Sequence, residues 1–247
     1  YKKAIRLYNK ALEINPKNPS IINNIAKVYF DIDKLNLAKE YCLKALELNK
    51  KDGNIQKILS LIYFKEQNYK DGWLLFDGRL NLSDFIEKNT SINKIRKKIP
   101  NISSLNIDSK ILVLREQGVG DEILYGTMYP DLLDTFKNVI IECDKRLINI
   151  FRRSFPEHSK KFVSMGSISE NELCLEKFEY VIYAGSLGKF FRNNIKDFSN
   201  GNFLNADINL IKKYKDFFYK LEQNINIGIS WKSFKNRYSD EKSLTLE

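Results

Sequence analysis

The hydrophobic pattern divides the chain into two parts of different texture. Up to about residue 82, apolar residues recur every three or four positions, which is the spacing of amphipathic helices. After residue 110 they gather in short β-branched or aromatic runs with amphipathic stretches between them, which predicts strands that alternate with helices. The intervening segment 83–109 is polar and contains Pro100, so we expect a linker there. The pattern predicts an α + α/β chain.

The first part repeats itself at an offset of 34 residues. The small residues Ala4, Ala38 and Gly72 coincide at this offset and let two helices approach closely. Pro16 cannot continue a helix, so it predicts a helix end and a turn. Larger side chains coincide as well: Tyr8, Cys42 and Phe76; Leu12, Leu46 and Leu80.

The segments "AIRLYNKALEINP" and "AKEYCLKALELNK" resemble the tetratricopeptide (TPR) repeat. The second departs from the pattern, because Lys50 stands where the proline usually lies. The resemblance implies stacked helical hairpins whose concave groove binds a peptide or partner protein. Alternatively, so short an array only supports the next domain. Since Tyr1 falls inside a repeat, we expect further repeats upstream in the natural polypeptide.

The second part predicts a mostly parallel sheet with helices between its strands. The expected strands are 110–115, 138–143, 161–165, 179–184 and 225–231. The expected helices are 121–136, 145–154 and 207–223. The predicted organisation is repeats over 1–82, a linker over 83–109, a Rossmann-like α/β domain over 110–224 and the start of a second such half over 225–247.

Composition limits the function classes only loosely. The net charge of +10 attracts anions, but no zinc finger, RNP-type motif or basic helix stands out, so we expect no nucleic-acid partner. The three cysteines are scattered, which is typical of free thiols in a reducing compartment and not of a metal site. With no apolar run long enough to cross a bilayer, we expect no membrane span and a cytoplasmic location.

A glycine turn follows the first predicted strand, in the stretch "ILVLREQGVGDEILYG". Gly118 and Gly120 allow a ligand to approach the backbone, and a helix starting at Asp121 favours an anion at its N-terminus. The spacing matches neither a P-loop nor the dinucleotide-binding fingerprint. Asp121 has a structural alternative, because an aspartate at this place caps a helix.

In its context this turn resembles the "E-Q-G-x-G-D" segment of bacterial TPR proteins with a heptosyltransferase-like glycosyltransferase domain. "GWLLFDGRL" resembles their last repeat, "AGSLGKFFRNNIKDF" a later segment in which Gly188 replaces a proline, and "IGISWKS" the strand that opens the second half. The resemblance implies a GT-B fold and inverting sugar transfer from a nucleotide-sugar to a hydroxyl group, without a required cofactor or metal.

The resemblance also implies roles for individual residues. Asp121 corresponds to the general base that removes the proton of the acceptor hydroxyl. Gly118 and Gly120 line the cleft for the nucleotide-sugar. In the second half, the expected donor-binding residues are Trp231, Lys232, Ser233 and Arg237.

Three hypotheses stay open at this point. The first is a glycosyltransferase that recruits its acceptor through the repeats, although this sequence lacks the family's main donor-binding segments and is expected to be inactive by itself. The second is a non-catalytic scaffold with a degenerate glycosyltransferase-like domain. The third is a nucleic-acid adaptor.

Overall fold

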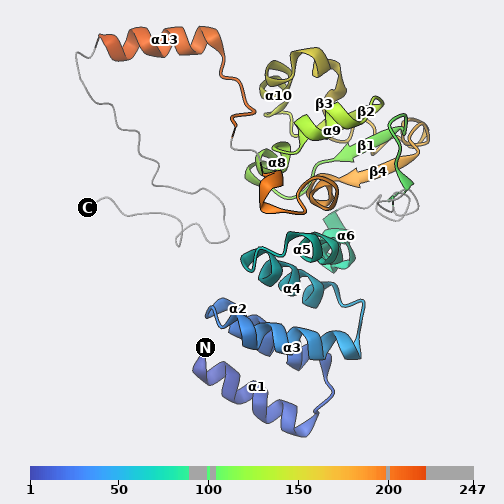
Figure 1. Cartoon of the computed structure of the whole chain (residues 1–247), viewed down its shortest axis with the longest axis vertical. Helices are drawn as coiled ribbons and strands as arrows, with labels where there is room; N and C mark the ends of the chain where they lie inside the picture. Colours follow the sequence, from blue (N-terminus) through green and yellow to red (C-terminus); the bar gives the residue numbers. More distant parts are fainter. Residues whose placement is uncertain (89–98, 101–103, 199–200, 221–247) are drawn as a thin grey trace. The chain divides into compact units, whose positions relative to one another are not determined.

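The computed structural model describes residues 1–88, 99–100, 104–198 and 201–220 (Figure 1). The described residues up to Asn205 belong to one compact unit and the described residues from Ala206 onward to a second, and each unit is considered by itself. Among the described residues, no helix is both long enough and apolar enough to cross a membrane.

The N-terminal part consists of helical hairpins. Its helices are α1 (Lys2–Ile14), α2 (Pro19–Asp31), α3 (Leu35–Leu48), α4 (Gly53–Lys65) and α5 (Tyr69–Phe76), followed by the 3-10 turn η1 (Asp77–Asn81). Helix α3 ends in the register of α1, although Lys50 replaces the proline, so the proline is not required for the helix end.

The local geometry repeats together with the sequence. Asn18 caps α2 and Asp52 caps α4, each by accepting hydrogen bonds from two backbone N–H groups of the first turn. Asp33 and Gln67 both adopt a positive φ, 58° and 59°, in the turn between the two helices of their repeats. The hairpins share one apolar core, which contains Ile22, Ala26, Ala38, Cys42, Ala45, Ile55, Leu59 and Ile62.

The second part contains a parallel four-stranded sheet. Its strands are β1 (Ile111–Leu114), β2 (Val139–Cys143), β3 (Phe162–Ser164) and β4 (Tyr180–Tyr183), in the order β3-β2-β1-β4. Doubly wound nucleotide-binding folds arrange their first four strands in this order. Each of these strands lies within a predicted range, while the predicted strand 225–231 lies outside the described residues.

Short helices lie between the strands and after β4, and their bounds differ from the sequence prediction. They are α8 (Val119–Gly126), α9 (Tyr129–Thr135), α10 (Ile148–Ser154), η3 (Pro156–Lys161), α11 (Glu172–Leu175), η4 (Ala184–Leu187), α12 (Gly188–Phe191) and η5 (Ile195–Asp197). The single predicted helix 121–136 was wrong, because Thr127 and Met128 separate α8 from α9. Pro130 explains the break, since its ring nitrogen cannot donate to the preceding turn.

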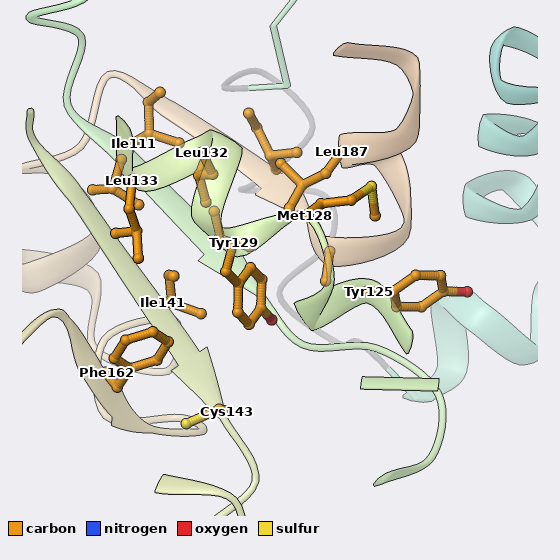
Figure 2. Close-up of a cluster of buried hydrophobic side chains, with 14 of the residues drawn as sticks. Ile111, Tyr125, Met128, Tyr129, Leu132, Leu133, Ile141, Cys143, Phe162 and Leu187 are labelled. Carbon is orange, nitrogen blue, oxygen red and sulfur yellow. The ribbon is translucent and has the colours of Figure 1, made fainter. Parts of the chain in front are cut away.

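Both faces of the sheet are buried. Alternate residues of β1 point to opposite faces: Ile111 and Val113 to one, Leu112 and Leu114 to the other. The first face packs against α8, α9 and α10, with Tyr129 completely buried at the centre of the cluster in Figure 2. Burial on both faces explains the continuous apolar run of β1 in the sequence.

The end of the repeat array contributes to the second face. Leu80 of η1 belongs to the same buried cluster as Leu112 and Tyr183. Helix α6 (Ser83–Lys88) lies in the segment expected to be a linker, and its Phe85 ring makes an edge contact with Tyr183 at a centroid distance of 4.9 Å. The repeats and the sheet therefore share a core and form one unit.

The second unit contains α13 (Ile208–Tyr219), within the predicted helix 207–223. Asp207 caps it by accepting hydrogen bonds from the N–H groups of Asn209 and Leu210. Residues 221–247 lie outside the described part of the chain.

Candidate functional site

The candidate site lies where the chain leaves the carboxyl ends of β1 and β4. Strand β1 pairs with β2 on one side and with β4 on the other, so the strand order reverses between β1 and β4. Ligands of open parallel sheets bind outside such a reversal, near the loops that follow the two strands. Here those loops are the glycine turn 115–121 and the segment 184–189.

The glycine turn is sharply bent. Gln117 has a φ of 62°, a left-handed conformation that costs a non-glycine residue roughly 1–2 kcal/mol. Its backbone oxygen accepts a hydrogen bond from Arg115 Nη2 at 2.8 Å, and its side-chain amide donates to the Tyr125 hydroxyl at 3.0 Å. Surrounding contacts of this kind keep a strained residue in place, and such residues cluster at functional sites.

The predicted helix start at Asp121 was wrong by two residues. Helix α8 begins at Val119, with Gly118 in the extended conformation that precedes a helix. Asp121 therefore lies in the first turn and reaches back: its Oδ2 accepts a hydrogen bond from the Gly118 N–H at 2.9 Å. This is the carboxylate half of a capping box.

The structure thus brings together the three predicted residues of the turn. Asp121 is half-buried, and its Oδ1 has no hydrogen-bond partner among the described residues. Gly120 is exposed, and a Cβ added there would meet nothing within 4 Å. A ligand can therefore approach the start of α8 from the Gly120 side.

The donor-binding residues expected in the second half cannot be placed. Trp231, Lys232, Ser233 and Arg237 lie outside the described residues. Within the described part of the chain, no group of three or more His, Cys, Asp or Glu side chains is arranged to hold a metal ion.

Sequence reasoning missed Glu116, which connects the two loops. Its carboxylate is buried, and Oε1 accepts a hydrogen bond of 2.6 Å from the Gly185 N–H in the loop after β4. A Cβ at Gly185 would lie 2.6 Å from this Oε1, so only glycine fits there. One signal was present in the sequence: an acidic residue two positions after the last residue of a fully apolar strand.

Glu116 belongs to a set of polar side chains that we call the junction network: Asp77, Arg79, Glu116, Ser186 and Lys189. The set links the repeat end, the glycine turn and the loop after β4. Arg79, Glu116, Ser186 and Lys189 are all buried. Burial by itself raises the pKa of the Asp77 carboxyl, but Arg79, Lys189 and Ser186 outweigh it and hold this pKa below its usual value.

A second buried carboxylate, Glu122, supports the turn from the α8 side. It accepts hydrogen bonds from Arg115 Nε at 2.8 Å and from the Asp144 N–H at 2.8 Å. Burial raises the pKa of Glu122, against the opposing effect of these two donors. The turn after β1 is thereby tied to the residue that follows β2.

The fold and these contacts define the class: a helical-repeat protein whose array is fused to a parallel α/β domain. A family model of the TPR repeat matches residues 1–33, and a tetratricopeptide repeat model matches residues 19–52. The N-terminal part therefore contains TPR repeats.

Two curated proteins are similar to the chain. Protein FlbA of Caulobacter vibrioides is 23% identical over 253 residues, which cover 94% of this chain and 41% of that protein. The Sol locus transcriptional repressor of Clostridium acetobutylicum is 36% identical over 88 residues, covering 36% of this chain and 26% of that protein. The chain thus spans less than half the length of either relative.

A solved structure also matches in part. It is the first TPR of Spaghetti (RPAP3) bound to the HSP90 peptide SRMEEVD, with 23% identity and a TM-score of 0.32, and the match covers 39% of this chain and 80% of that one.

Proposed function

We propose that the natural polypeptide is a TPR-linked glycosyltransferase. Its α/β part transfers a sugar from a nucleotide-sugar to a hydroxyl group, with inversion, and the repeats recruit the acceptor as a peptide or protein segment. The observation that carries this proposal is the glycine turn at the strand reversal, where Asp121 lies beside open space at Gly120.

The chemistry assigns a proton transfer to Asp121. As the acceptor oxygen attacks the anomeric carbon, its proton must be removed, and a carboxylate within hydrogen-bond reach accepts it. Oδ2 is held by the Gly118 N–H, which fixes the carboxylate group, while Oδ1 is available to the acceptor hydroxyl. The nucleoside diphosphate leaves with the bonding electrons of the glycosidic bond, and its charge requires nearby donors or cations.

Asp121→Asn tests this role in the full-length protein. Asparagine retains a side-chain oxygen that can accept from the Gly118 N–H, so we expect unfolding stability to change by no more than about 0.5 kcal/mol. It cannot serve as a base, so we expect the rate of sugar transfer to fall at least ~100-fold. Asp52→Asn is the matched control, because Asp52 caps α4 by the same kind of hydrogen bond. Undiminished transfer by Asp121→Asn excludes Asp121 as the base.

A second candidate function is a non-catalytic scaffold, and one observation favours it. The Asp121 carboxylate already has a structural partner in the Gly118 N–H, which accounts for an acid at this position without catalysis. A scaffold binds no nucleotide-sugar, so calorimetric titration of the full-length protein with common uridine and guanosine diphosphate sugars separates the two functions. Saturable binding supports the enzyme, and its absence across the panel supports the scaffold.

A further inference from the structure

The end of the repeat array reaches into the strand reversal of the α/β part. Arg79 of η1 is 3% exposed, and Glu116 of the glycine turn is 4% exposed. They form a bidentate pair: Arg79 Nε donates to Glu116 Oε2 at 2.7 Å, and Nη2 donates to Oε1 at 2.6 Å. A forked pair of this kind fixes orientation as well as distance.

Arg79 has no donor left for a ligand. A guanidinium carries five N–H donors. Besides the two hydrogen bonds to Glu116, Nη1 donates to the Phe76 carbonyl and to Asp77 Oδ1, and Nη2 donates to Ser186 Oγ. All five donors are satisfied inside the protein, so Arg79 acts through the groups that it holds. Lysine, with three donors on one nitrogen, cannot replace this pattern.

The groups that Arg79 holds determine where the glycine turn begins. Glu116 directly precedes Gln117, the residue with the positive φ, and its Oε1 also accepts from the Gly185 N–H. The pair therefore fixes the end of β1 relative to the loop after β4. Without it, the strained turn would be held only from its own side, by the hydrogen bonds from Arg115 to Gln117, from Gln117 to Tyr125 and from Gly118 to Asp121.

A buried, fully bonded pair of this kind is a weak source of stability, because two charges must leave water. Apolar side chains of similar volume often pack as stably in such a place. They cannot, however, hold the carboxyl end of β1 through directed hydrogen bonds. The contribution of the Arg79–Glu116 pair to stability can therefore be measured separately from its effect on the position of the glycine turn.

We infer that Arg79, although it belongs to the repeat array, is a positioning residue for the glycine turn and thereby for Asp121. The inference rests on the proposed function for its catalytic consequence only. It makes the last repeat a required part of the site and not only a means of recruiting the acceptor.

The test compares three variants of the full-length protein: Arg79→Lys, the apolar double variant Arg79→Met with Glu116→Leu, and the exposed control Arg6→Lys. Hydrogen exchange of the segment 115–121 is measured together with kcat and the KM for acceptor and donor. We expect exchange of this segment to rise at least fivefold, and kcat to fall at least tenfold, in both Arg79 variants. Neither change is expected in the control.

The double variant distinguishes positioning from general stability. If it unfolds at the wild-type urea midpoint but shows faster exchange and lower kcat at unchanged KM, the inference is supported. Wild-type exchange and wild-type kcat in a folded Arg79 variant overturn it. If even the wild-type protein transfers no sugar while exchange rises in the Arg79 variants, the proposed enzyme function fails but the positioning of the turn stands.

Discussion

Two glycine-to-alanine substitutions in helices have opposite expected effects on stability. Gly188, at the start of α12, has φ −55° and ψ −35°, so its backbone accepts alanine without strain. A Cβ there, however, would overlap the Trp73 indole ring from α5, closer than the 3.0 Å that real Cβ atoms keep. Gly120 is also helical, but a Cβ there meets nothing within 4 Å.

The magnitudes follow from these contacts. At both positions alanine gains about 0.5–1 kcal/mol relative to glycine, because the unfolded chain loses less entropy. At Gly188 the overlap costs about 1–3 kcal/mol. Moving Trp73 also disturbs the hydrogen bond of 2.8 Å from its Nε1 to the Arg192 carbonyl, worth about 1 kcal/mol. We therefore expect Gly188→Ala to destabilise by about 1–3 kcal/mol and Gly120→Ala to stabilise by up to about 1 kcal/mol.

Urea unfolding followed by far-ultraviolet circular dichroism measures both effects without relying on the fluorescence of the displaced tryptophan. Trp73→Leu removes the obstructing ring, so adding Gly188→Ala to it should cost less than adding it to the wild type. If Gly188→Ala proves as stable as the wild type, the packing of α5 against α12 is not as described. A loss of stability in Gly120→Ala would show that a Cβ at this position does not lie in open space.

Three further outcomes are expected. Because the pKa of Asp77 is held below its usual value, its ionised form stabilises the protein above about pH 4, and this stabilisation is lost as the pH falls further. Asp77→Asn should therefore reduce the fall of the urea unfolding midpoint with decreasing pH, and an unchanged pH dependence would contradict this. Burial raises the pKa of Cys42 and Cys143 to about 12, whereas Cys174 is partly exposed. In the folded protein at about pH 8, iodoacetamide should therefore alkylate Cys174 faster than the other two cysteines. Equal rates of alkylation would contradict the described burial. Glu142 accepts hydrogen bonds from three backbone N–H groups in the loop after β3. Glu142→Leu leaves these groups without their acceptor, so it should lower the free energy of unfolding by at least about 2 kcal/mol. An unchanged urea midpoint would contradict this.

Gly120→Ala also bears on function. Its Cβ is harmless in the free protein, so a variant that is stable but no longer binds a nucleotide-sugar would indicate that the ligand passes over this residue. Unimpaired binding would place the ligand elsewhere along the sheet edge.

Periodicity in the sequence determined the elements, because each depends on local spacing. The repeat register of Ala4, Ala38 and Gly72 and the four apolar runs specify hairpins and strands without reference to distant residues. The break in the predicted helix 121–136 was also encoded locally, by Pro130. The apolar periodicity continues across this proline, so the hydrophobic pattern alone does not show the break.

Only the tertiary structure decided which residues meet at the site. Arg79, Glu116 and Ser186 come from three separate segments, and each looks like an ordinary polar residue in its own segment. Their pairing depends on the strand order, which places the ends of β1 and β4 side by side, and on the packing of η1 against the sheet. Because burial makes an unpaired charge costly, the fold has to bring such residues together, whereas the sequence shows only that they are present.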